Sequence, residues 1–203
     1  MELFENAILL TGGIATGKSS VCNFLKLHGF SVIDADKIAH EVLDENAKEI
    51  ERIFGKEFVK EGKVDRRALG ERIFSSPSDK KSLEDLLHPK IRERIEKEAL
   101  NLERYKVPYI VDIPLFFETG EKYDIKPVVV VYAPKEEQLK RLIEREGYDL
   151  KHAKERIESQ IDIEEKRKKA DFVIDNSKDI KHLQKEVDRF LDFVRGMYAD
   201  IKI

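Results

Sequence analysis

Three glycines and a lysine follow an apolar run in the stretch "LLTGGIATGKSS". It matches the phosphate-binding pattern G-x-x-x-x-G-K-[ST], with Gly12, Gly17, Lys18 and Ser19 at the defined positions. In such a loop the backbone N–H groups turn inward around phosphate oxygens, and the N-terminus of the following helix adds partial positive charge. The lysine ammonium can reach the β- and γ-phosphates, and the serine hydroxyl can ligate Mg²⁺. The stretch therefore predicts a nucleotide site.

Carboxylates that follow two later apolar runs are candidates for acid–base and metal chemistry. Asp34 and Asp36 come directly after the run that starts at Phe30. A kinase needs a group near the C-terminal edge of its sheet to deprotonate an acceptor hydroxyl. We expect Asp34 to be that base, and Asp36 to cap the next helix or to support the site. Asp112 either holds Mg²⁺ through water or is a turn residue at a strand end.

Arg141 and Arg145 lie four residues apart on a segment of helical period, so they share one helix face. They can clamp ATP phosphates and neutralise charge on the transferring group. Alternatively, they form an exposed salt-bridged face with Glu137 and Glu144. The spacing alone leaves both interpretations open.

Five short apolar runs predict the strands that position these groups. They are apolar nearly throughout, which is typical of a parallel sheet covered by helices on both faces. The runs are residues 7–11, 30–34, 109–113, 128–132 and 172–175. We expect Gly29 to cap the first helix, Pro134 and Gly147 to bound a later one, and Gly196 to close the last. Ser177 or Asp179 is expected at the start of that last helix.

Two helical excursions interrupt the alternation of strands and helices. Helical pieces without a core strand occupy residues 47–54, 66–74, 78–87 and 89–104. Pro89 should separate the last two, because the residue before a proline, here His88, is disfavoured in helical geometry. A second helical segment, residues 149–170, lies between the fourth and fifth strands. Such excursions let an enzyme close over its substrate.

The composition limits the functions that the chain can have. A length of 203 residues fits one domain with small insertions, and a net charge of −3 provides no overall field for nucleic acid or membranes. Cys22 is the only cysteine, and neither a signal peptide nor an apolar run of about 18 residues is seen, which predicts a cytoplasmic protein. The histidines lack metal-ligand spacing, so we expect no protein-bound zinc.

Other nucleotide-binding functions fit less well than a small-molecule kinase. A GTPase needs Asp-x-x-Gly after its third strand, and Leu115 stands where that glycine belongs. Two alternatives stay open, namely a kinase for another small metabolite or nucleotide, and a nucleotide-dependent binding or switch protein without turnover.

Several motifs together resemble the dephospho-coenzyme A kinases, over about residues 8–176. They are "LTGGIATGKSS", "VIDADKIAHEV", "FGKEFVKEGKVDRRAL", "LLHPKI", "DIPLFFE", "QLKRLIER" with "ERIESQ", and "ADFVIDN". The resemblance implies a three-layer α/β P-loop fold with a five-stranded parallel sheet, a helical substrate-binding insertion and a helical lid. It also implies transfer of the γ-phosphate of ATP to the ribose 3′-hydroxyl of dephospho-CoA, the last step of CoA synthesis.

The resemblance further implies an organisation and a set of partners. The nucleotide-binding core would comprise residues 1–45 and 107–203, with a lid at about 141–168, and residues 46–106 would form the CoA-binding insertion. The partners would be ATP, Mg²⁺ that arrives with ATP, and dephospho-CoA, without nucleic acid or membrane. We expect a monomer or a weak homo-oligomer.

Site residues carry over position by position. The resemblance implies catalytic roles for Asp34, Lys18 and Arg141. It implies ATP contacts for Gly12, Gly13, Ala15, Thr16, Gly17, Lys18, Ser19, Ser20, Arg141 and Asn176. Substrate contacts are implied for Asp36, Asp65, Arg66, His88 and Arg92, although His88 can instead cap the break before Pro89.

One departure from the family pattern concerns the phosphate loop. The family commonly has Gly-Ser where this chain has Ala15 and Thr16. The alanine methyl would be tolerable there only if its φ were negative.

Overall fold

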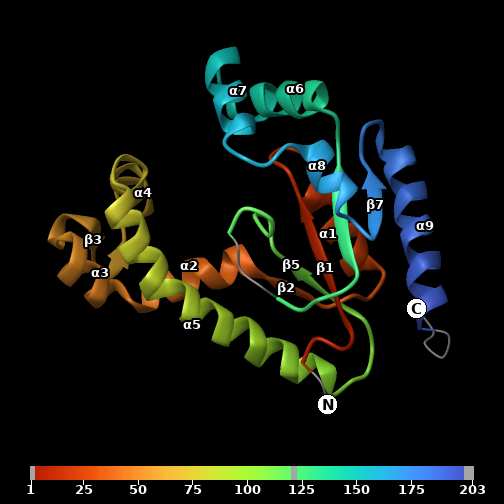
Figure 1. Ribbon diagram of the computed structural model, residues 1–203, viewed down its shortest axis with the longest axis horizontal. Coiled ribbons are helices and arrows are strands. Elements are labelled where there is room, and N and C mark those ends of the chain that lie inside the picture. The colour runs from red at the N-terminus through yellow and green to blue at the C-terminus, as the bar shows by residue number, and fades with distance from the viewer. Residues whose placement is uncertain (1–2, 120–122, 199–203) are drawn as a thin grey trace. The chain divides into compact units, whose positions relative to one another are not determined.

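A computed structural model describes residues 3–119 and 123–198. Its main sheet has five strands in the spatial order β2-β5-β1-β6-β7 (Figure 1). They are β1 Ala7–Gly12, β2 Val32–Asp34, β5 Tyr109–Asp112, β6 Val128–Tyr132 and β7 Phe172–Asp175. Strand β1 pairs in parallel with β5 and β6, and β7 pairs in parallel with β6. The predicted three-layer α/β fold with a parallel sheet is confirmed.

Helices pack against this sheet, and the side chains of the apolar runs form the buried core between them. The helices that follow β1, β6 and β7 are α1 Lys18–Leu27, α6 Lys135–Glu146, α7 Leu150–Glu158, α8 Ile163–Lys168 and α9 Ile180–Met197. Buried side chains of α1 and α9, such as Leu25 and Phe190, pack with Ile8 and Leu10 of β1. Helix α8 lies against β6 (Figure 1). No helix in the described part of the chain combines the length and apolarity that crossing a bilayer requires.

Most of the glycine, proline and aspartate caps predicted for the helices around the main sheet bound a helix, but Gly196 does not. Gly29 has φ +89° and ends α1 in a Schellman motif, in which Phe30 N–H donates to Leu25 O and Gly29 N–H to Lys26 O. Helix α6 begins after Pro134 and ends at Gly147, and Asp179 caps α9. Gly196 does not close α9, which continues to Met197, because a glycine in a last turn weakens a helix without ending it.

Residues Asp34–Glu98 form a second compact unit, apart from Met1–Ile33 and Ala99–Ile203. Its elements are α2 Ala35–Glu45, α3 Ala47–Phe54, the 3₁₀ helix η1 Lys56–Phe58, β3 Val59–Lys60, β4 Lys63–Val64, α4 Arg66–Ser75 and the first part of α5 Pro77–Glu103. Ala47, Ile50, Val64 and Leu69 make its core. The hairpin of β3 and β4 was not predicted. Its turn residues, Glu61 and Gly62, both have positive φ, as a type I′ turn requires.

The expected helix break at Pro89 is wrong, because α5 runs unbroken from Pro77 to Glu103. A proline inside a helix removes one hydrogen bond and costs about 3 kcal/mol. Burial offsets this cost on both sides of the proline, since Leu87 is 7% exposed and Ile95 is 1% exposed. Each fully buried apolar side chain contributes about 1.5–3 kcal/mol, so a few such contacts keep the helix continuous. His88 therefore lies within a continuous helix and is not a cap at a helix break.

Candidate functional site

The loop between β1 and α1 has the geometry of a phosphate-binding loop. Gly17 precedes α1 with φ +85°, and the helix starts at Lys18. The buried Thr16 closes the turn, because its Oγ1 donates to Gly13 O at 2.9 Å. A Cβ on Gly12 would lie 2.8 Å from Thr16 Oγ1 and 3.0 Å from Val131 O, so only glycine fits where strand meets loop. A steric constraint therefore explains why the sequence pattern has glycine at position 12.

Ala15 has φ +57°, so the expectation of a negative φ at this position is wrong. The tight turn imposes this value, since Thr16 N–H donates back to Gly13 O at 3.3 Å. A left-handed conformation costs a residue with a Cβ about 1–2 kcal/mol. The surrounding contacts must offset that strain.

Replacing Ala15 by glycine is expected to increase the free energy of unfolding by about 0.5–1 kcal/mol, because strain relief exceeds the added freedom of the unfolded chain. Urea denaturation followed by circular dichroism measures this difference. Ala68→Gly, inside α4, is the control and should destabilise by about 1 kcal/mol. An equal decrease in the free energy of unfolding in both variants would show that Ala15 is unstrained.

Lys18 extends from the first position of α1 to the end of β5. Its Nζ lies 2.6 Å and 2.7 Å from the two carboxylate oxygens of Asp112. Cys22 Sγ lies 3.4 Å from the same carboxylate. Burial, together with the neighbouring Asp112 carboxylate, raises the pKa of the Cys22 thiol to about 12, so this thiol stays protonated. Asp112 is thus an ion-pair partner of Lys18, a role that neither prediction for it included.

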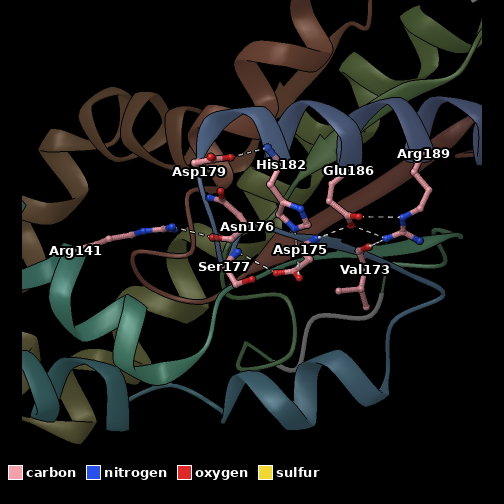
Figure 2. A network of polar contacts seen from close by, with 9 residues as sticks. All are labelled: Arg141, Val173, Asp175, Asn176, Ser177, Asp179, His182, Glu186 and Arg189. Carbon is pink, nitrogen blue, oxygen red and sulfur yellow. Dashed lines mark hydrogen bonds and ion pairs between the residues drawn. The ribbon is translucent and has the colours of Figure 1, made fainter.

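Arg141 and Asn176 both contact the carbonyl oxygen of Thr16. Asn176 Nδ2 donates to Thr16 O at 2.8 Å, and Arg141 Nη1 lies 3.4 Å from the same oxygen. Arg141 Nη2 donates to Asn176 O at 2.8 Å (Figure 2). Its Nε donates to Glu137 at 2.8 Å. Arg141 therefore forms the predicted ion pair with Glu137 and also contacts the loop. Arg145 is exposed and pairs with Glu146 at 2.7 Å.

A polar network fixes the backbone on both sides of Asn176 (Figure 2). Asp175 accepts from Ser177 N–H at 2.9 Å, and Glu186 accepts from Asp175 N–H at 3.1 Å. Partial burial acts to raise the pKa of Glu186, but hydrogen bonds from Arg189 and from Asp175 N–H hold that pKa below its usual value. The carboxylate is therefore charged near neutral pH, and the loop after β7 is anchored to α9.

An open pocket of about 430 Å³ lies over the phosphate loop. Ala15, Gly17, Ser19, Ser20, Arg141, Glu144 and Arg145 line it. Five of these seven residues are among the predicted ATP contacts. Gly12 and Thr16 shape the loop, Gly13 accepts the bond from Thr16, and Asn176 supports the loop from β7. Hydroxyl groups, a helix N-terminus and two guanidinium groups make this pocket suited to an anionic ligand.

Asp34 caps α2, because its Oδ1 accepts from Lys37 N–H at 2.9 Å. The expectation that Asp36 is the cap is therefore wrong, and Asp36 lies in the first turn of the helix. The cap belongs to the residue that still has extended backbone geometry, and in this chain that is the last residue of β2.

Apart from Asp36 on α2, the predicted substrate contacts of the second unit lie at two places. At the start of α4, Asp65 caps the helix through Ala68 N–H, and Arg66 pairs with Asp44 at 2.6 Å. The hydrogen bond from Lys60 lowers the pKa of the Asp65 carboxyl. On α5, His88 and Arg92 are one turn apart, and Arg92 pairs with Glu96 at 2.8 Å. Their contact with a substrate stays a prediction.

Sequence reasoning missed three polar side chains that contact the phosphate loop or its supports: Glu118, Gln160 and Lys166. Lys166 stands in the charged run "EEKRKK", in which nothing marks one lysine as buried. Glu118 and Gln160 end the motifs "DIPLFFE" and "ERIESQ", and position within those motifs was the available signal.

Comparisons with known proteins agree with this geometry. A family model described as dephospho-CoA kinase matches residues 6–182. A dephospho-CoA kinase of Sulfurimonas denitrificans is 51% identical over 98% of this chain and 99% of its own length. A solved structure of a dephospho-CoA kinase from Campylobacter jejuni is 43% identical with a TM-score of 0.75, and the match covers 94% of this chain and 98% of that one. A Thermus thermophilus structure, TT1252, is 34% identical with a TM-score of 0.80, covering 92% and 96%.

Proposed function

The chain belongs to the dephospho-CoA kinase family, and on this premise we propose that it transfers the γ-phosphoryl group of ATP to the ribose 3′-hydroxyl of dephospho-CoA. The products are CoA and ADP. The observation that carries the proposal is the phosphate loop itself, with the guanidinium of Arg141 and the amide of Asn176 both on Thr16 O beside an open pocket.

ATP binds with its phosphates over the loop, and Lys18 is the cation at the centre of the site. Its ammonium lies in an ion pair with Asp112. Polyphosphate offers a denser negative charge, so Lys18 moves to the β- and γ-phosphates as ATP enters. Arg141, already oriented by Glu137 and Asn176, adds a second positive charge against the transferring group.

Asp34 is the proposed base. The 3′-oxygen of the ribose forms a bond to the γ-phosphorus while the bond between that phosphorus and the β–γ bridging oxygen breaks. The hydroxyl proton passes to the Asp34 carboxylate, and ADP leaves. One carboxylate oxygen already accepts from Lys37 N–H, which fixes the direction of the group. The proposed substrate contacts are Asp36, Asp65, Arg66, His88 and Arg92.

Mg²⁺ is proposed to arrive with ATP. Ser19 lies exposed in the first turn of α1 and lines the same pocket as Ala15 and Gly17, so its hydroxyl can be a ligand beside bound phosphates. The ion neutralises phosphate charge when it is bound. Within residues 3–119 and 123–198, no three His, Cys, Asp or Glu side chains form a group that could hold a metal ion by themselves.

Purified protein is expected to release ADP from ATP only slowly alone and rapidly when dephospho-CoA is added. The added phosphate should be found on the 3′-oxygen of the product, by phosphorus NMR or mass spectrometry. Equal release without dephospho-CoA, or faster turnover of a nucleoside or nucleotide acceptor, would contradict the proposed substrate. Size-exclusion chromatography in the same preparation tests the proposed monomer or weak homo-oligomer, and a cytoplasmic location stays a prediction.

A further inference from the structure

Lys166 is a charged side chain that is entirely buried. It belongs to α8, where its neighbours Arg167 and Lys168 are exposed, yet its own side chain is 0% exposed. Its Nζ donates to Gly12 O at 2.8 Å and lies 2.5 Å from Glu118 Oε1. Burying a charge is unfavourable unless it is paired and hydrogen-bonded, so these two contacts explain why the ammonium can lie there.

Glu118 and Gln160 make further contacts, which involve the segment between α7 and α8. Glu118 Oε1 also accepts from Ile161 N–H at 3.1 Å, whereas its Oε2 is buried with no hydrogen-bond partner among the residues that the structure describes. Gln160 Oε1 accepts from Ile14 N–H at 2.8 Å. Lys166 and Gln160 therefore bind the phosphate loop at two points two residues apart, Gly12 and Ile14.

The two halves of the loop are supported by different elements. Asn176 and Arg141 hold the second half through Thr16 O. Gln160 and Lys166, with Glu118 beneath them, hold the first half. Neither half is fixed by local hydrogen bonds alone, and the strained φ of Ala15 lies between the two sets of contacts.

We propose that Glu118, Gln160 and Lys166 are positioning residues, which fix the first half of the loop and make ATP affinity depend on the segment between α7 and α8. They act through backbone atoms of Gly12 and Ile14 and need not touch the nucleotide. Phosphate binding depends on the direction of several backbone N–H groups at once, so a small shift of this backbone weakens all of them. This inference rests on the proposed nucleotide site.

The test uses Lys166→Met and Gln160→Ala in the full-length protein, with Lys168→Met as the matched control. Lys168 is on the same helix, with a side chain 70% exposed and paired with Glu165. The dissociation constant for Mg–ATP is measured by calorimetry, and KM is measured for each substrate. Loss of one such hydrogen bond predicts a dissociation constant and a KM for ATP that are about tenfold higher in both variants. KM for dephospho-CoA should stay within about twofold, and Lys168→Met should match the wild type.

A purely structural role predicts a different result. Such a role would lower the folded fraction and the apparent kcat but leave ATP affinity unchanged in the molecules that fold, and this outcome would overturn the inference. A rise in KM for dephospho-CoA as large as that for ATP would do the same. If Lys166→Met does not fold, Gln160→Ala decides, because it leaves no buried charge unpaired. Wild-type protein that does not bind ATP would instead contradict the nucleotide site.

Discussion

Asp34→Asn is expected to lower kcat by about 10²–10⁴-fold while the dissociation constant for ATP stays unchanged. A positioned base that accepts the hydroxyl proton contributes an effect of this size, and an amide cannot accept that proton. The structure makes asparagine the appropriate replacement. Asp34 caps α2 through Lys37 N–H, and asparagine is as good a cap as aspartate, so the helix should persist.

Steady-state kinetics with both substrates, combined with calorimetric titration of ATP, measure this effect. Glu41→Gln is a matched control, because Glu41 is an exposed acid on the same helix that pairs only loosely with Lys37, at 3.8 Å. It should leave kcat unchanged. A kcat within threefold of the wild type in Asp34→Asn would remove this residue from the mechanism, and lost ATP binding would show that it acts on the nucleotide instead.

Gly17→Ala is expected to weaken ATP binding by about 100-fold or more, since two separate penalties add. The φ of +85° is strained for alanine, and the new Cβ would lie 2.1 Å from Asn176 Nδ2. Asn176 must then move, which breaks the hydrogen bond from its side chain to Thr16 O. The same movement displaces Asn176 O, the carbonyl oxygen to which Arg141 Nη2 donates. Both groups that support the second half of the loop are thereby displaced.

Two other glycines separate the causes of that loss. Gly29 has a similar φ of +89° but nothing within 4 Å of an added Cβ, so Gly29→Ala should reduce stability without reducing ATP affinity. Gly70 lies within α4 and has nothing within 4 Å of an added Cβ, so Gly70→Ala should reduce neither stability nor ATP affinity. Calorimetry of ATP binding, with thermal unfolding of each variant, distinguishes these cases. ATP affinity in Gly17→Ala equal to that in Gly29→Ala would show that the contact with Asn176 is unimportant.

Local signals in the chain were sufficient for much of the fold and for part of the site. Continuous apolar runs predicted the five strands of the sheet, because a strand covered on both faces needs apolar residues at every position. Residue type alone predicted the helix ends at Gly29, Pro134 and Asp179. Glycine and proline act there through their own backbone, and aspartate acts through the next few N–H groups. The phosphate loop was found for the same reason.

Interactions with neighbouring parts of the structure, beyond the preference of the residue itself, explain the errors. Pro89 does not break α5, because buried side chains on both sides of it stabilise one continuous helix. The positive φ of Ala15 is imposed by the closing of its turn, and the cap of α2 belongs to Asp34 because β2 ends there. None of these outcomes follows from the preference of the residue alone.

The sequence by itself determined the five strands of the main sheet and most of the helices, where the phosphate loop lies, and which family the chain resembles. These properties depend on residues close together along the chain. Only the tertiary structure decided that Lys18 pairs with Asp112, that Arg141 and Asn176 meet on Thr16 O, and that Lys166 is buried beneath the loop. In an isolated segment each of these polar groups would be hydrated equally well, and it is the packing of residues 94 to 160 positions apart that removes water and selects one partner.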